Sequence, residues 1–374
     1  LFIPADTVVD LRNENMKRQD DTHAIGVMSG TSLDGVDLCY VKFYGDGAKD
    51  WQYQILATAC YDYPDDWIKQ LSNAHLMGNQ QVKELDTAYT NLLAESYIKR
   101  FIDEFSLKDI DFVASHGHTV FHQPERNYTL QIGNLPFLAD LIGYPVICDF
   151  RMQDVKKGGQ GAPLVPIGDT LLFSGYQACV NIGGFVNISI KSKDEFLAYD
   201  ICPANKVLNH LSLQLGYPFD EKGRLAASGK VDQQCLAQLN QLEFYQQEPP
   251  KSLGIEWVEK EIFPILEKSQ LLTIDQLATF TQHVANQLAN HLKGVDQVLI
   301  TGGGTYNQHL INLVEKQIGQ KITIPDDQLI NYKEALVFAF LGLLRFQSEI
   351  NILATVTGAP ADHCGGFIYQ PQKS

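Results

Sequence analysis

The chain has 374 residues, of which 45% are hydrophobic and 20% charged. These fractions are typical of a globular protein and exclude a disordered or fibrous one. A net charge of −15 argues against a nucleic-acid partner, because a protein needs basic groups to neutralise phosphates. The length allows two domains, and no stretch reaches the roughly 18 to 20 apolar residues of a membrane span.

The cysteines are odd in number, scattered, and never arranged as C-x-x-C. This pattern favours unpaired thiols in a reducing compartment over a disulfide framework or a zinc site. We therefore expect a cytoplasmic protein. The cysteines are Cys39, Cys60, Cys148, Cys179, Cys202, Cys235 and Cys364.

The first half of the chain predicts three strands followed by alternating helices and strands. Apolar runs predict strands and apolar residues at helical spacing predict helices. The predicted strands are 24–28, 36–43, 51–61, 112–115 and 146–149, and the predicted helices are 85–105 and 134–143. A polar turn is expected at 115–119.

The second half repeats this order. Strands are predicted at 178–182, 186–190, 195–200 and 297–301, and helices at 205–215, 233–242, 274–292 and 333–346. The last helix is almost uniformly apolar, so we expect it to be buried between layers. The repeated order predicts a duplicated α/β domain with a cleft between the copies.

The turn between the first two strands has the residues of an anion-binding loop. Glycines at 30 and 35 let the backbone approach a ligand, and the Ser29, Thr31 and Ser32 hydroxyls can donate to phosphate oxygens. Asp34 or Asp37 can hold Mg²⁺ through water. An ordinary tight hairpin is the alternative.

Further glycine turns end strands at Gly183-Gly184 and at 302–304, and acidic residues stand at Asp34, Asp149 and Asp200. Together these turns suggest a nucleotide held between two lobes. The G-x-x-x-x-G-K-[ST] and G-x-G-x-x-G motifs are both absent. The chain therefore resembles the superfamily of actin, sugar kinases and heat-shock ATPases.

Within that superfamily the chain closely resembles the anhydro-N-acetylmuramic acid kinases. The likeness runs from about residue 26 to 358. The matching motifs are 26–37, 115–117 with Thr119, 131–134, 149–151 with Asp154, 158–166, 181–184 with Asn187, Asp200 with Pro203 and Asn205, 219–220 with Gly223 and Gly229, 250–252 with Gly254, 302–304 with Asn307, and 334–335.

The resemblance implies a duplicated actin-like (ribonuclease H-like) α/β ATPase fold, with two lobes around a nucleotide cleft. We expect an N-terminal extension at 1–21, a first lobe at 22–165 and a second lobe at 166–350. Residues 351–374 would form a tail returning toward the first lobe.

The resemblance also implies a kinase that opens the 1,6-anhydro ring of the sugar with water and phosphorylates the freed 6-oxygen from ATP with Mg²⁺. Asp200 matches the catalytic base, and Asp34 is the candidate Mg²⁺ residue. The expected nucleotide residues are Gly30, Thr31, Ser32, Leu33, Asp34, Gly35, Val36, Asp37, Gly183, Gly184, Gly302, Gly303 and Gly304. The expected sugar residues are Thr119, Gln131, Asn134, Arg151 and Glu334.

The chain departs from the family pattern at several positions. Residues 201–205 read Ile-Cys-Pro-Ala-Asn and lack two glycines that the family carries, and 251–256 read Lys-Ser-Leu-Gly-Ile-Glu, without a threonine and an arginine. Met152-Gln153 replace two arginines, and His118 replaces a glutamine. These changes bear on which substrate is bound and on the rate of the reaction.

Other interpretations remain open. A degenerate nucleotide-binding sensor or scaffold, or a kinase for a different anhydrosugar, fits the same motifs. His116, His118 and His122 allow a metal-dependent hydrolase if strand alternation places the first two on one face. Glu334 is either a solvated residue at a helix start or a ligand contact. The expected partner is a small anhydrosugar, without nucleic acid or membrane, in a homodimer by family habit.

Overall fold

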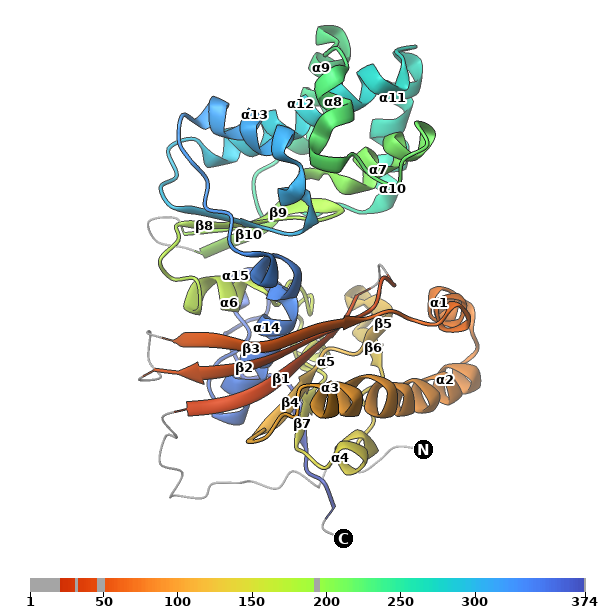
Figure 1. Cartoon of the computed structure of the whole chain (residues 1–374), viewed down its shortest axis with the longest axis vertical. Coiled ribbons are helices and arrows are strands. Elements are labelled where there is room, and N and C mark those ends of the chain that lie inside the picture. Colours follow the sequence, from red (N-terminus) through yellow and green to blue (C-terminus); the bar gives the residue numbers. More distant parts are fainter. Residues whose placement is uncertain (1–20, 31–32, 46–50, 192–195, 373–374) are drawn as a thin grey trace.

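The computed structural model describes residues 21–30, 33–45, 51–191 and 196–372. These residues form two α/β lobes, one above the other in Figure 1. The first lobe is built on a six-stranded sheet and the second on a four-stranded sheet. The expected extension at 1–21 lies outside the described residues except for Asp21, the first residue of β1.

The first sheet has the order β12-β7-β4-β1-β2-β3. β1, β2 and β3 form an antiparallel meander, β4 and β7 run parallel to β1, and β12 closes the edge antiparallel to β7. The strands are β1 (Asp21–Ser29), β2 (Val36–Tyr44), β3 (Gln52–Tyr61), β4 (Phe112–Ser115), β7 (Val146–Cys148) and β12 (Phe367–Tyr369).

The second sheet repeats this topology with the order β10-β9-β8-β11. β8 to β10 form the antiparallel meander and β11 runs parallel to β8. An isolated parallel bridge between Leu299 and Thr323 occupies the place of β7. The predicted duplicated fold is confirmed. The strands are β8 (Ala178–Ile182), β9 (Phe185–Lys191), β10 (Phe196–Pro203) and β11 (Val298–Thr301).

Helices cover both sheets (Figure 1). Those of the first half are α1 (Asp65–Ser72), η1 (Ala74–Leu76), α2 (Asn79–Leu92), η2 (Leu93–Ile98), α3 (Lys99–Glu104), η3 (Pro124–Arg126), α4 (Phe137–Ile142), α5 (Met152–Lys156) and α6 (Pro166–Leu171). Those of the second half are α7 (Asn205–Gln214), η4 (Glu221–Gly223), α8 (Arg224–Ser228), α9 (Gln233–Asn240), η5 (Glu243–Gln246), α10 (Ile255–Trp257), η6 (Val258–Ile262), α11 (Phe263–Lys268), α12 (Thr273–Leu292), η7 (Gly303–Tyr306), α13 (Gln308–Ile318), α14 (Asp327–Phe346) and α15 (Ala354–Thr357).

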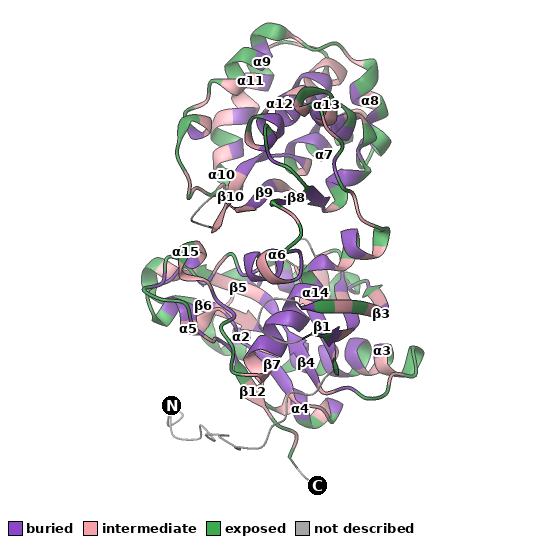
Figure 2. Cartoon of the chain, turned by 90° about the vertical axis from the view of Figure 1, so that its left-hand side faces the viewer, coloured by how far each residue is buried: buried purple, intermediate pink, exposed green. Residues whose placement is uncertain are grey.

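Helix α14 is the element whose position differs most from the sequence prediction. It falls in the range expected for the second lobe, yet its apolar side chains join Phe43, Phe112 and Ile147 of the first sheet in one core. Figure 2 shows α14 as a buried helix among the strands of that lobe. Gly26 of β1 makes this possible, because a Cβ there would collide with the Ala335 carbonyl group.

Three smaller differences concern element bounds. The helix expected at 85–105 is a run of α2, η2 and α3, and the helix expected from 333 begins at Asp327, where Asp326 accepts the Leu329 N–H at 2.9 Å. The polar turn expected at 115–119 leads instead into a two-stranded sheet, β5 (His118–Gln123) and β6 (Tyr128–Ile132).

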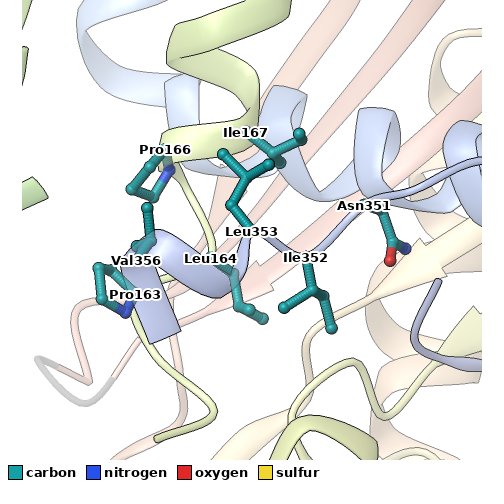
Figure 3. Close-up of a pocket in the computed structure, with 8 residues that line it drawn as sticks. All are labelled: Pro163, Leu164, Pro166, Ile167, Asn351, Ile352, Leu353 and Val356. Atoms are coloured by element: carbon teal, nitrogen blue, oxygen red, sulfur yellow. The ribbon is translucent and has the colours of Figure 1, made fainter. Parts of the chain in front are cut away.

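Two segments beside the lobe junction pack against each other. Residues 163–167, which lead into α6, and residues 351–356, which lead into α15, line a small apolar recess (Figure 3). The recess has no enclosed room for a water molecule, so it is a packing contact between the two crossing segments.

Candidate active site

Asp200 lies at an irregularity near the end of β10. It pairs with Asn187 of β9, and the register then shifts so that Cys202 faces Val186 and Ile201 has no partner. The Asp200 N–H donates to the Lys251 carbonyl (3.0 Å), and its Oδ2 accepts the Leu253 N–H (2.8 Å). Burial raises the pKa of this carboxyl group, and the Leu253 and Asn187 hydrogen bonds partly offset the shift.

The segment that holds Asp200 is fixed by a lysine. Lys251 Nζ donates to the carbonyls of Phe244 (3.1 Å) and Gln247 (3.0 Å) and lies 4.8 Å from the centroid of the Phe244 ring. Both hydrogen bonds to Asp200 come from main-chain atoms of residues 251 and 253. The leucine side chain at position 253, which departs from the family pattern, therefore does not remove either hydrogen bond.

Arg151 is enclosed by groups from several elements. Its Nε donates to His116 Nε2 (3.0 Å) and its Nη1 donates to the Gly161 carbonyl (2.7 Å). Burial lowers the pKa of Arg151 to about 10, and the nearby charge of Glu334 opposes that shift. The guanidinium therefore stays charged at neutral pH.

Glu334 lies in the second turn of α14 and not at a helix start, because the helix begins at Asp327. Part of its surface is exposed to solvent. The surrounding protein nevertheless desolvates its carboxyl group, and this desolvation raises the pKa of that group. Arg151 lowers this pKa, while Asp37 and Asp34 raise it. The structure thus brings Arg151, Glu334 and the acidic residues of the first glycine turn into one electrostatic neighbourhood.

The first glycine turn follows β1. Thr31 and Ser32 lie outside the described residues, and Gly30, Leu33, Asp34, Gly35, Val36 and Asp37 are described. Leu33 has a φ of 60° and Gly35 one of 152°, and a Cβ at Gly35 would come within 2.8 Å of Cys60 Sγ. Burial, together with Asp34, raises the pKa of Asp37 against the opposing effect of Cys60.

Ser29 does not offer its hydroxyl to an anion. It is buried beneath the turn, and its Oγ forms hydrogen bonds with the hydroxyls of Tyr63 and Tyr89, each at 2.7 Å. The two tyrosine hydroxyls are 2.5 Å apart. The expectation that Ser29 binds phosphate is wrong because its side chain points into the core, where it anchors the base of the turn.

The glycine turns of the second lobe are tightly packed. The Gly183 N–H donates to the Phe185 carbonyl (3.0 Å), and the carbonyls of Gly183 and Gly184 accept N–H groups from residues 204–206 at the start of α7. Gly302 has a φ of 87° and Gly304 packs on Ile182, whereas a Cβ at Gly303 would meet nothing within 4 Å.

The third turn also contacts α14. The Tyr306 hydroxyl, at the end of η7, donates to Asp327 (3.1 Å) and Asn331 (3.3 Å). Helix α14 therefore carries groups that face the first glycine turn, Arg151 and the third glycine turn.

The expected sugar residues of the first lobe lie on and beside the β5–β6 hairpin. Gln131 Nε2 donates to Thr119 Oγ1 (3.3 Å) and to Thr129 Oγ1 (2.9 Å). Asn134 Nδ2 donates to the His116 carbonyl (3.0 Å), so Asn134 connects this hairpin to the neighbour of Arg151.

The histidines do not form a metal site. Gly117, with a φ of 74°, interrupts the strand alternation, so the His116 ring packs on Phe338 of α14 (4.7 Å) and the His118 ring packs on Tyr89 of α2 (6.2 Å). Among the described residues no group of three or more His, Cys, Asp or Glu side chains is placed to hold a metal. The metal-hydrolase interpretation is therefore wrong.

Two residues that sequence reasoning did not place in the site fix the glycine loop at 158–161. Asp154, fully buried, accepts the Gly161 N–H (2.6 Å) and the Thr357 hydroxyl (2.8 Å), and the Thr357 carbonyl accepts the Gln160 N–H (2.7 Å). Asp154 stood in a matching motif, but nothing in the sequence paired it with Thr357. Helix α15, which ends at Thr357, also packs against β10.

The family of this two-lobed chain follows from a sequence comparison. The family model for anhydro-N-acetylmuramic acid kinase matches residues 22–371. The chain belongs to the anhydro-N-acetylmuramic acid kinase family. It is therefore a kinase, and a kinase of this family uses a nucleotide. The resemblance stated from the motifs is confirmed.

Curated relatives agree with this assignment. A relative named anhydro-N-acetylmuramic acid kinase from Chromobacterium violaceum is 34% identical, over 92% of this chain and 98% of its own. One of the same name from Caldanaerobacter subterraneus is 32% identical, over 91% of this chain and 95% of its own.

Solved structures are more distant. Component A of the Acidaminococcus fermentans (R)-2-hydroxyglutaryl-CoA dehydratase is 17% identical with a TM-score of 0.45, covering 85% of this chain and 96% of its own.

In the part of the chain that the structure describes, no helix is both long and apolar enough to cross a membrane.

Proposed function

We propose that the enzyme opens 1,6-anhydro-N-acetylmuramic acid and phosphorylates it in cell-wall recycling. The oxygen of a water molecule bonds to C1, the C1–O6 bond breaks, and O6 takes the γ-phosphoryl group of ATP. The water proton passes to Asp200. The products are N-acetylmuramic acid 6-phosphate and ADP.

The environment of Asp200 is the observation that carries this proposal. A general base works best when its pKa is moved toward the working pH and its carboxylate is held in place. Burial raises the pKa of Asp200, and one oxygen is fixed by the Leu253 N–H. Asn187 also forms a hydrogen bond with this carboxyl group, and each carboxylate oxygen can accept more than one hydrogen bond, so the held carboxylate can still receive the proton of the attacking water.

The nucleotide would lie between Gly30–Asp37 of the first lobe and the turns at Gly183-Gly184 and Gly302–Gly304 of the second. Phosphoryl transfer depends mainly on positioning and on neutralising charge. The neighbouring Asp34 and Asp37 carboxylates offer the oxygen ligands that Mg²⁺ takes, usually through water, and Asp34 is the residue we assign to it. When bound, the ion would neutralise charge on the phosphates.

The sugar would contact Thr119, Gln131, Asn134, Arg151 and Glu334. Arg151 is the cation of this group, and its charge suits the lactyl carboxylate of the muramic acid. Hydroxyl and amide groups of the β5–β6 hairpin suit the neutral sugar oxygens.

The test is to incubate the enzyme with Mg-ATP and 1,6-anhydro-N-acetylmuramic acid in ¹⁸O-labelled water and to weigh the product at early times. A phosphorylated sugar with one ¹⁸O at C1 is expected. Authentic N-acetylmuramic acid 6-phosphate, kept in the same water for the same time, corrects for exchange of the anomeric oxygen.

The alternatives predict other results of the same experiment. A phosphorylated product from a different anhydrosugar would reassign the substrate. ATP binding without a phosphorylated product from any anhydrosugar would identify a sensor or scaffold that has lost turnover.

A further inference from the structure

Two of the three nitrogens of Arg151 already have partners in the protein. Nε donates to His116 Nε2 and Nη1 donates to the Gly161 carbonyl. The guanidinium has five N–H groups, so the donors that remain lie on Nη2 and on the second hydrogen of Nη1. Among the described residues Nη2 has no partner, so a ligand that bridges the two terminal nitrogens would use Nη2 together with the remaining hydrogen of Nη1.

His116 is able to accept this bond in one protonation state only. Because Nε2 receives the Arg151 N–H, it carries no proton, and the neutral ring has its proton on Nδ1. Burial, followed by the charge of Arg151, lowers the pKa of His116, which keeps the ring neutral. The lowered pKa favours the neutral ring, which is the form that can accept the Arg151 N–H.

The backbone of His116 is held by two hydrogen bonds and its ring packs against an aromatic ring. The residue donates its backbone N–H to the Val27 carbonyl (3.0 Å) and accepts Asn134 Nδ2 on its own carbonyl (3.0 Å), and its ring lies 4.7 Å from that of Phe338. With 5% of its surface exposed, the ring has little room to turn.

Helix α14 connects this support to the other neighbour of Arg151. Phe338, which packs on His116, and Glu334, whose charge acts on Arg151, are four residues apart and so lie on one face of the helix. The packing of one helix face therefore supports the acceptor of Arg151 and brings a carboxylate close enough to act on its charge.

We propose that His116 is a positioning residue for substrate selection: by accepting the Arg151 Nε–H, it turns the Nη1–Nη2 edge toward a carboxylate of the sugar. A carboxylate fits two parallel N–H donors in one plane. An uncharged ester of the same group lacks the charge for this contact. This inference rests on the proposed function, because it assigns the carboxylate to the anhydrosugar.

The kinetic test compares 1,6-anhydro-N-acetylmuramic acid with its lactyl methyl ester. His116→Phe keeps a ring against Phe338 but removes the acceptor, and a hydrogen bond to a charged group is worth about tenfold or more in affinity. We expect KM for the acid to rise about tenfold with kcat little changed, while KM for the ester stays the same. His116→Gln, whose Oε1 can replace Nε2 as acceptor, is expected to restore most of the preference for the acid.

His118→Phe is the matched control, because His118 is also a buried histidine of this segment but faces Tyr89 and the Gly30 backbone. It is expected to leave the acid-to-ester preference unchanged and to act, if at all, on KM for ATP. An equal rise of KM for acid and ester in His116→Phe, or a His116→Gln variant no better than His116→Phe, would overturn the proposal.

A second readout does not depend on turnover. With ¹⁵N-labelled arginine and histidine, NMR should show one Arg151 Nε–H protected from exchange and His116 protonated on Nδ1. His116→Phe should lose that protection and His116→Gln should keep it. An unprotected Nε–H, or a proton on His116 Nε2, would refute the contact even in an active kinase. Failure of the wild type to phosphorylate either sugar would refute the proposed function and the substrate assignment, leaving NMR to decide the contact.

Discussion

Asp200 is the residue whose substitution separates chemistry from binding most clearly. Asp200→Asn keeps an oxygen for the Leu253 N–H and removes the base, and loss of a general base costs on the order of 10² to 10⁴ in rate. We expect kcat to fall by this amount while Kd for ATP, measured by calorimetry, stays nearly unchanged. Asp66→Asn, on the exposed face of α1, is a control that should keep full activity. Turnover at the wild-type rate would remove Asp200 from the role of base.

The same residue predicts the acid side of the pH profile. A base acts only when ionised, and burial raises the pKa of Asp200 above the ordinary value of 3.8. Activity should therefore fall as the pH drops through a midpoint above 3.8. A profile of kcat/KM that stays flat down to pH 4 would contradict this.

Asp149 predicts a pH-dependent stability. Burial raises its pKa from 3.8 to about 6, so its favourable contribution is complete below pH 3.8 and is lost as the pH rises through 6. Asp149→Asn keeps the acceptor for the Met152 N–H without the charge. It should raise the free energy of unfolding by about 1 to 2 kcal/mol at pH 8, and by less at pH 4.5. Urea unfolding at the two pH values measures the difference, and an equal gain at both would show that the charge is not its cause.

The sequence proposed the charged residues of the candidate site but not the residues that contact them. Asp200, Arg151 and Glu334 come from motifs in which type and order are sufficient. The contact between His116 and Arg151 joins residues 35 positions apart, and that between Asp154 and Thr357 joins residues 203 apart. No local pattern encodes such pairs, because they depend on how strands and loops meet in space.

At the level of secondary structure, the contact between β1 and α14 positions the site. Gly26→Ala would place a Cβ 2.8 Å from the Ala335 carbonyl carbon and 3.0 Å from the Ala339 Cβ. The helix must then move, and overpacking of this kind costs about 1 to 3 kcal/mol. Because Glu334 adjoins Ala335, activity should fall as well.

Denaturant unfolding and the standard kinase assay measure the two effects of Gly26→Ala. Gly175→Ala is its control, since a Cβ there meets nothing within 4 Å, and it should be neutral in both. A Gly26→Ala variant as stable as the wild type would show that α14 packs less closely on β1 than described.

The elements themselves were predictable to different degrees. The antiparallel meanders followed from strand-length apolar runs, and both are present. Helix α14 was correctly predicted to be buried, but its nearly uniform apolarity gave no face to show which sheet it covers. The β5–β6 hairpin was missed because its residues are mostly polar and half-buried.

At the scale of the whole molecule, a buried ion pair joins α14 to α6. Lys333 Nζ and Asp169 Oδ1 are 2.6 Å apart, with 6% and 5% of their side chains exposed. Burial alone would lower the pKa of Lys333, but Asp169 outweighs this effect and raises it. Lys333→Met leaves Asp169 charged and unpaired, which should cost about 3 to 5 kcal/mol of the free energy of unfolding.

The double variant Lys333→Met, Asp169→Asn tests whether the loss comes from the unpaired charge. It should recover most of the stability in urea unfolding, because no buried charge remains. If the double variant is as unstable as the single one, packing around Lys333 and not its charge supports this junction.

The two-lobe organisation was predictable because each half begins with the same meander and glycine turn. The path between the lobes was not. The chain leaves the first sheet after β7, builds the second sheet, and returns to the first with α14 and β12.

This path has a consequence for synthesis on the ribosome. When β7 has emerged, the first sheet still lacks the helix that covers one face and the strand that closes one edge. Both elements are synthesised only after the second lobe. Until then the first lobe exposes apolar surface and an open strand edge, and both features promote aggregation. The amino-terminal half is therefore expected to need protection by chaperones until the last residues are made, although it is synthesised first.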